Sequence, residues 1–288
     1  YNNIPVQHAA YTLQTGRKTF RFRRAFVAAS VSEAVEKIND GTAGPVIENP
    51  VDTGTGNTHR PAFIFTHTPE AGIVPVWQEL YESIPLLRET VDDCFDKLKP
   101  ITGFHMKRRL FDKGARLTPE VLTVASVVFQ YAVFNILQQS GVSPSLVAGR
   151  GSGEIAAARI AGVISLTEML QMSFSAGQLL KQASRKDDGT LTIPAGMSGI
   201  FKQKLQQLSF QPPQVPYLSG VTGKIEDLGV IGNAGYWSGL DALFTAPLFE
   251  EGLNRVLTGD TQENEPASSF ILTAGVGELS LPGSLQAE

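Results

Sequence analysis

The sequence predicts an α/β fold with a mostly parallel sheet. Two short, largely apolar runs, Ala62–Phe65 and Ser145–Gly149, have the character of strands that are buried on both faces. Segments with helical apolar periodicity lie between and after these runs, and the longest begins at Thr118 and Pro119. Strands that alternate with helices along the chain are typical of α/β domains, so this order predicts the fold class.

A small unit is predicted before this domain. A short helix is expected over Ala9–Gln14, followed by an exposed, alternating strand over Thr19–Arg23 that continues into Ala25–Ala28. Ser30 and Glu33 have the spacing of a capping box, which predicts the start of a second helix. The order helix, strand, helix indicates a module of its own.

A connector separates this module from the rest. Residues 41–60 are rich in glycine, proline, threonine and asparagine, as linking segments are. We therefore expect a first domain at 1–50, a connector at 51–60 and a second domain at 61–288.

Helices follow the first buried strand of the second domain. Two shorter helices are expected over Val76–Ser83 and Pro85–Leu98, and the long helix has one apolar face and should end at Gly141. The next strand runs straight into a glycine-rich turn, and a helix is expected from Glu154.

The C-terminal half of the second domain continues the alternation. Ser165 and Glu168 form another capping box, which predicts a further helix. Later strands are expected over Pro216–Val221 and Ser269–Thr273.

Composition limits the kinds of partner and site. The 288 residues carry a formal net charge of −4 at pH 7, which argues against nucleic acid or an anionic membrane surface as a partner. The single cysteine, Cys94, excludes an intrachain disulfide and a cysteine-based metal site, and its place on the apolar side of a helix predicts a buried thiol. No apolar run reaches the ~18 residues of a membrane span, and no signal peptide opens the chain. We expect a cytoplasmic piece of a longer polypeptide, without a cofactor.

The glycine-rich turn carries the most specific motif. Residues Gly149-Arg-Gly-Ser-Gly-Glu154, followed by an alanine-rich helix, resemble the nucleophile elbow of malonyl-type acyltransferases, which reads Gly-His-Ser-x-Gly-Glu. Further segments match the same family in the family's order: Tyr11–Arg17, Leu208–Pro213, Ser219–Gly223, Tyr236–Trp237, Ala246–Pro247 and Leu272–Gly277. The chain thus resembles the acyltransferase domain of a modular polyketide synthase, similar to malonyl-CoA:ACP transacylase, with its ketosynthase-to-acyltransferase linker.

The resemblance implies an architecture. Residues 1–50 would be the linker domain, and residues 61–288 a degenerate acyltransferase-type core, which is similar to the α/β-hydrolase fold. The family inserts a ferredoxin-like subdomain that walls the substrate cleft. Here only Ser184 to Gly196 bridge that point, too few residues for such a subdomain, so we expect it to be lost or truncated.

The elbow lacks the family's reactive side chains. An ungapped alignment puts Gly151 where the nucleophilic serine belongs and Arg150 where the preceding histidine belongs. In the family that serine stands on a sharp strand-to-helix turn beside oxyanion donors. Glycine has no nucleophile, yet it accepts a left-handed backbone without strain, so we expect the turn to persist.

Ser152 is the candidate to replace the lost nucleophile. One step along the turn swings a side chain by about 100° once the helix begins, which would carry the hydroxyl away from a base and from oxyanion donors. We expect Ser152 instead to cap the helix that starts at Glu154.

Other positions of the family's site also depart from its pattern. The family has a histidine base well after the elbow, whereas none of the four histidines here follows His105. Ala176 stands where the arginine that pairs with the malonyl carboxylate belongs. The family's Gly-Gln-Gly oxyanion turn reads Thr66–Pro69 here, with Thr68 inside it and a proline that removes a backbone donor. His67 in this turn is best interpreted as an exposed loop histidine.

Three hypotheses follow. The first is a non-catalytic domain, no enzyme by itself, that supports the arrangement of the ketosynthase of the same polypeptide and an acyl carrier protein. The second is an acyltransferase that uses Ser152 with His67 to load malonyl-type units onto an acyl carrier protein; Arg150 cannot be its base because the guanidinium stays protonated. The third is a module that docks a carrier protein or a trans-acting acyltransferase, with Arg17–Arg24 or Lys107–Arg109 as basic contacts.

Overall fold

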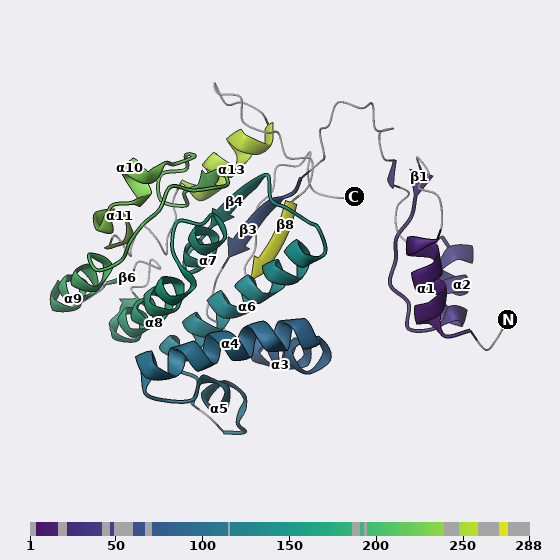
Figure 1. Cartoon of the computed structure of the whole chain (residues 1–288), viewed down its shortest axis with the longest axis horizontal. Coiled ribbons are helices and arrows are strands. Elements are labelled where there is room, and N and C mark those ends of the chain that lie inside the picture. The colour runs from purple at the N-terminus through teal and green to yellow at the C-terminus, as the bar shows by residue number, and fades with distance from the viewer. Residues whose placement is uncertain are drawn as a thin grey trace. The chain divides into compact units, whose positions relative to one another are not determined.

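The computed structural model describes residues 4–16, 22–41, 47–48, 60–66, 71–114, 116–185, 191–192, 195–238, 248–258 and 271–275. The chain forms two compact units, residues 1–58 and residues 59–288 (Figure 1). Each is described by itself.

The first unit pairs two helices with a minimal hairpin. Helices α1 (Val6–Thr15) and α2 (Val31–Asn39) accompany the antiparallel strands β1 (Phe22–Arg23) and β2 (Ile47–Glu48). Both helices were expected from the sequence. The predicted continuation of the strand into Ala25–Ala28 is wrong, because these residues have no strand partner.

The segment Ala25–Ala28, which was expected to be a strand, is instead held by a hydrogen bond to α2. The backbone oxygen of Val27 accepts a hydrogen bond from Lys37 Nζ at 2.9 Å. Ser30 Oγ accepts from the Glu33 amide at 3.1 Å, as the capping box predicts, but Glu33 Oε2 accepts from the Ala29 amide rather than from that of Ser30. The backbone before α2 is therefore held by the helix and not by a sheet.

The second unit contains a parallel four-stranded sheet, which confirms the predicted fold class. The strands are ordered β7 (Tyr217–Leu218), β4 (Leu146–Gly149), β3 (Ala62–Thr66) and β8 (Ile271–Gly275). The expected strand at Pro216–Val221 is shorter than predicted, because Ser219 Oγ accepts hydrogen bonds from the amides of residues 221 and 222 and turns the chain.

Two apolar cores lie on opposite faces of this sheet, because successive strand residues point to opposite sides. Phe63 and Phe65 belong to the larger core, which the helices between β3 and β7 cover. Ala62 and Ile64 belong to a smaller core that is closed by Phe249 and its neighbours on α13 (Phe249–Thr258). The result is a layered arrangement with the sheet in the middle (Figure 1).

The helices of the larger layer include the predicted ones in the predicted order, with four additions. They are α3 (Val74–Ser83), after a 3-10 turn at Ala71–Ile73, α4 (Pro85–Thr102), α5 (Met106–Phe111), α6 (Pro119–Gln139), α7 (Gly153–Ile160), α8 (Leu166–Gln182), α9 (Ala195–Leu205), α10 (Leu228–Ile231) and α11 (Ala234–Ser238). Helices α5, α9, α10 and α11 were not predicted. Cys94 on α4 is fully buried as expected, and burial raises the pKa of its thiol to about 12.

Helix α6 differs from its predicted single apolar face. Its first turns are buried all round, and the polar residues Thr123, Ser126 and Gln130 lie inside with the apolar ones. The helix is long and apolar enough to cross a membrane, yet 67% of its most apolar 18 residues is buried inside the protein. It is packed as a core helix, and Gly141 follows its end with a positive φ of 86°.

The capping box of α8 is complete. Ser165 Oγ accepts from the Glu168 amide at 3.2 Å, and Glu168 Oε2 accepts from the Ser165 amide at 2.7 Å. Between α8 and α9 the described residues form only a two-stranded antiparallel hairpin, β5 (Ser184–Arg185) with β6 (Leu191–Thr192).

Candidate functional site

The candidate site is the tight turn that joins β4 to α7. The strand ends at Gly149 and the helix begins at Gly153. A Cβ atom on Gly149 would lie 2.2 Å from the Glu154 Cα, and one on Gly153 would lie 2.1 Å from the Phe65 backbone oxygen. Both glycines are therefore needed so that α7 can approach the two central strands this closely.

Gly151 occupies the middle of this turn in the left-handed region, with φ of 63°. This is the backbone conformation that the sequence predicted for a persisting elbow. The position at the head of the turn carries no side chain, so it offers neither a nucleophile nor a proton acceptor.

Arg150 is tied to the neighbouring strand and to α13. Its amide donates to the Phe65 backbone oxygen at 2.8 Å, and its guanidinium Nη1 lies 3.4 Å from Glu250 Oε1. Both side chains of this ion pair are partly exposed, so the pair contributes little to stability. The contact directs the guanidinium toward α13.

Ser152 does not cap α7, and that prediction is wrong. Its backbone is already helical, with φ of −68° and ψ of −14°, and its side chain makes no capping hydrogen bond. An N-cap needs an extended backbone to bring its oxygen to the free amides, and Ser152 lacks one. The side chain is fully buried, and Oγ has no hydrogen-bond partner among the described residues.

The remaining predicted positions lie on other elements or outside the described residues. Ala176 lies on α8 and is fully buried. His67 and Thr68 lie outside the described residues. Of the histidines that the structure describes, His8 lies on α1 of the first unit, and His105 lies at the start of α5 and makes no hydrogen bond to Ser152.

A buried polar cluster behind the turn was missed by sequence reasoning. Glu154, on the first turn of α7, is fully buried, and its Oε1 accepts hydrogen bonds from Tyr217 Oη at 3.0 Å and from Tyr236 Oη. Tyr236 Oη also lies 2.6 Å from Ser219 Oγ. The sequence signal for this cluster was the carboxylate of Glu154 at the start of an alanine-rich helix. A carboxylate that is buried at such a place needs hydrogen-bond partners.

The cluster has an unusual carboxyl group. Burial raises the pKa of Glu154 to about 7, although the hydrogen bonds from Tyr236 and Tyr217 act in the opposite direction. Oε2 makes no hydrogen bond of normal geometry in the described part of the chain. Because the group is sealed from solvent, its geometry suits a structural link between α7, β7 and α11 and not proton transfer to a substrate.

Metal chemistry finds no support in the described ranges. No group of three or more histidine, cysteine, aspartate or glutamate side chains is placed to hold an ion there.

Comparison with protein families gives two matches. Residues 77–199 match the family described as acyl transferase domain, and residues 1–38 match the family described as CurL-like, PKS C-terminal. The first match contains the turn between β4 and α7.

Curated relatives are far longer than this chain. The spectinabilin polyketide synthase system protein NorC of Streptomyces orinoci is 27% identical over 226 residues, which are 78% of this chain and 9% of NorC. NorA of the same system and organism is 31% identical over 203 residues, which are 67% of this chain and 10% of NorA. The chain thus spans about a tenth of the length of these relatives.

Solved structures share the fold. The acyl transferase domain of ZmaA superimposes with a TM-score of 0.76 at 22% identity, covering 96% of this chain and 76% of that domain. The acyl transferase domain of SpnD superimposes with a TM-score of 0.68 at 20% identity, covering 94% of this chain and 82% of that domain. The fold is therefore that of polyketide synthase acyltransferase domains, and the matches together support an acyltransferase domain of a polyketide synthase.

Proposed function

We propose that this chain is an acyltransferase-like domain of a polyketide synthase that supports the arrangement of neighbouring domains without catalysing acyl transfer. The observation that carries the proposal is Gly151, which holds the left-handed head of the turn with no side chain. Acyl transfer through a covalent ester needs an activated oxygen at this point. The turn is kept and the reactive group is missing.

The neighbourhood of the turn supports the same conclusion. Arg150 pairs with Glu250 and offers no base, since its guanidinium stays protonated. Ala176, at the position of the family's carboxylate-binding arginine, has no polar atom in its side chain and is fully buried. A malonyl-type substrate would find neither a nucleophile nor its usual cationic partner.

The alternative enzyme would use Ser152. Its hydroxyl is fully buried and makes no hydrogen bond to a described residue, whereas a serine nucleophile needs contact with both a base and the substrate. This burial disfavours Ser152, and the proposal therefore treats it as a structural residue.

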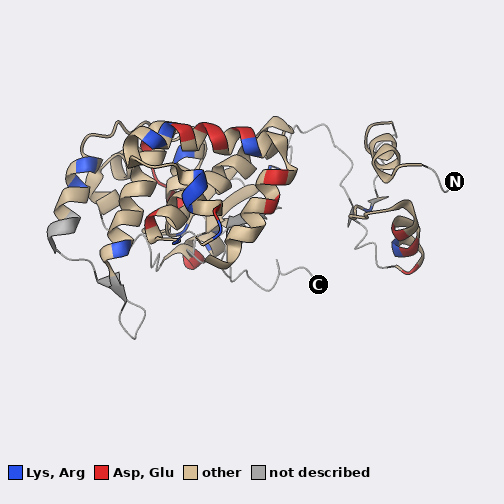
Figure 2. Cartoon of the chain, turned by 90° about the horizontal axis from the view of Figure 1, so that it is seen from below, with Lys and Arg blue, Asp and Glu red and all other residues tan. Residues whose placement is uncertain are grey.

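The partners follow from the proposed role. Residues 1–50 act as the linker to a ketosynthase domain of the same cytoplasmic polypeptide, and an acyl carrier protein passes nearby or docks. The exposed cations Lys107, Arg108 and Arg109 on α5 favour an acidic partner, although the chain as a whole has a net charge of −4 (Figure 2). An acyltransferase acting in trans would load the carrier.

Acylation measured by intact mass tests the loss of catalysis. We expect no mass increase after incubation with malonyl-CoA or methylmalonyl-CoA, under conditions in which an active acyltransferase domain is labelled. The Ser152→Ala variant is the matched control. Labelling of the parent chain that disappears in this variant would establish Ser152 as a nucleophile and refute the proposal.

Titration with carrier proteins tests the docking part. Binding should weaken with added salt and in an Arg108→Glu, Arg109→Glu double variant, while a Lys202→Glu variant on α9 should bind as the parent does. Absence of binding at high micromolar concentration, or equal binding by all variants, contradicts docking through α5.

A further inference from the structure

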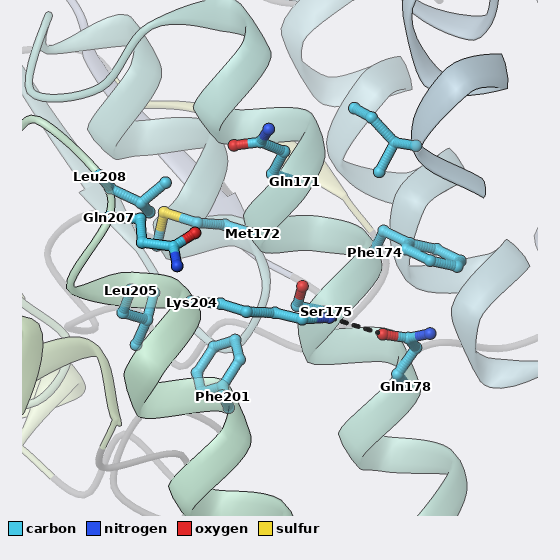
Figure 3. Close-up of a pocket in the computed structure, with 11 residues that line it drawn as sticks. Gln171, Met172, Phe174, Ser175, Gln178, Phe201, Lys204, Leu205, Gln207 and Leu208 are labelled. Atoms are coloured by element: carbon cyan, nitrogen blue, oxygen red, sulfur yellow. Dashed lines mark hydrogen bonds between the residues drawn. The ribbon is translucent and has the colours of Figure 1, made fainter.

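A cavity of about 430 Å³ lies between α8 and α9 (Figure 3). No residue of the turn between β4 and α7 lines it. Its inner wall includes the buried apolar side chains Met172, Phe201 and Leu205. Its rim carries polar side chains, namely Gln171, Gln178, Lys204 and Gln207. A concavity of this volume that combines apolar side chains with polar groups can hold a small molecule.

Ser175 adds a hydroxyl to the inner wall. The residue is only 6% exposed, and its Oγ is not one of the fully buried polar atoms that lack a hydrogen-bond partner. A hydroxyl at the wall of an open cavity can pair with water or with a bound partner. Ser175 lines the cavity, so a bound molecule is in a position to supply that partner.

Lys204 brings a positive charge to the same place. Its side chain extends across the cavity toward α8, where Nζ donates to Gln178 Oε1 at a long distance of 3.3 Å (Figure 3). An ammonium group has three donors, so capacity remains for a further acceptor. Among the described residues that line the cavity there is no aspartate or glutamate, and Lys204 is the cation.

We propose that this cavity binds a small carboxylic acid with an apolar chain. The carboxylate accepts hydrogen bonds from Lys204 Nζ and Ser175 Oγ, and the chain packs against Met172, Phe201 and Leu205. A charge-assisted bond to the ammonium group fixes the orientation of the ligand. A single cation suits one carboxylate better than a doubly charged phosphate. The inference goes beyond the proposed function, since it requires no acyl transfer.

Octanoate is a suitable probe for the site. Saturation-transfer NMR detects contact with the protein, and calorimetric titration of the whole chain gives the affinity. We expect Lys204→Gln to weaken octanoate binding about fivefold, as for a partly exposed ionic contact, and to leave 1-octanol binding unchanged. Ser175→Ala should weaken octanoate about threefold through the lost hydrogen bond.

The control is Lys202→Gln, which removes an exposed lysine of the same helix that does not line the cavity. Circular dichroism checks that each variant is folded, and both lysine substitutions lie on the exposed side of α9. Absence of octanoate binding to the parent chain at millimolar concentration overturns the proposal. So does an equal loss in the Lys202 and Lys204 variants, or a Lys204→Gln effect that is the same for octanoate and octanol.

Discussion

The buried carboxyl of Glu154 makes the stability of this domain depend on pH. Its pKa rises from an ordinary value of 4.5 to about 7 in the folded protein, chiefly because burial disfavours the charged form. The folded state therefore binds this proton more tightly than the unfolded state does. Stability is greatest while the group is protonated in both states, falls as the pH rises from about 4.5, and levels off above about 7.

The size of the effect follows from the two pKa values. A rise of the pKa from 4.5 to about 7 lowers the free energy of unfolding by about 3 kcal/mol at high pH. Somewhat less than 1 kcal/mol of this loss has already occurred at pH 5. We therefore expect the free energy of unfolding to drop by about 2 kcal/mol between pH 5 and pH 8 on account of this one group. Glu120 and Glu168, whose pKa values are lowered, contribute stability that is lost only as the pH falls below this window.

Urea unfolding at pH 5, 6, 7 and 8 measures this dependence. In Glu154→Gln the drop should disappear, because the amide stays neutral and can still accept from Tyr217 and Tyr236 through its oxygen. Glu89→Gln, which changes an exposed glutamate on α4, should behave as the parent chain does. A parent and a Glu154→Gln variant with parallel pH profiles would show that Glu154 does not titrate in this range, and would refute the argument from burial.

Three further predictions concern the turn. Gly153→Ala should destabilise the domain by about 3 kcal/mol or prevent folding, since the new Cβ would lie 2.1 Å from the Phe65 backbone oxygen. Thermal unfolding measures this, with Gly199→Ala as the control because its Cβ would meet nothing within 4 Å. Ser152→Ala should leave stability unchanged or raise it by about 1 kcal/mol, because it removes an unpaired buried hydroxyl. Ser173→Ala should lower stability, because it removes the 2.9 Å hydrogen bond to the Leu170 backbone oxygen. Equal losses in both variants would contradict this. Gly151→Ser should cost about 1 kcal/mol of stability from its positive φ and should remain unlabelled by malonyl-CoA; labelling in the mass assay would mean that a base is within reach after all.

Much of the second unit could be predicted because its signals are local. Alternating apolar strands and helices predicted the parallel sheet, and the capping box at Ser165 marked the start of α8 to the residue. The strand expected over Ala25–Ala28 failed because an alternating pattern requires a partner strand, and β2 is only two residues long. A pattern along one segment says nothing about whether a neighbour exists.

The candidate site divides in the same way. The left-handed conformation of Gly151 could be predicted from a motif, because a backbone angle is a local property. The burial of Ser152 and the Glu154–Tyr217–Tyr236 cluster could not, since they depend on residues that meet only after the sheet and α11 have assembled. The cavity between α8 and α9 likewise depends on the packing of two helices that are separated in the chain.

The close packing of α7 on β3 and β4 places different constraints on the residues of the turn between β4 and α7. Gly149 and Gly153 are held by architecture alone, because any side chain there would push the helix off the strands. Gly151 between them is favoured for another reason, its positive φ, and Ser152 is limited in size by its complete burial. The shape of the turn therefore does not depend on a reaction, because Gly149 and Gly153 are required by the packing of α7 whether or not a nucleophile stands between them.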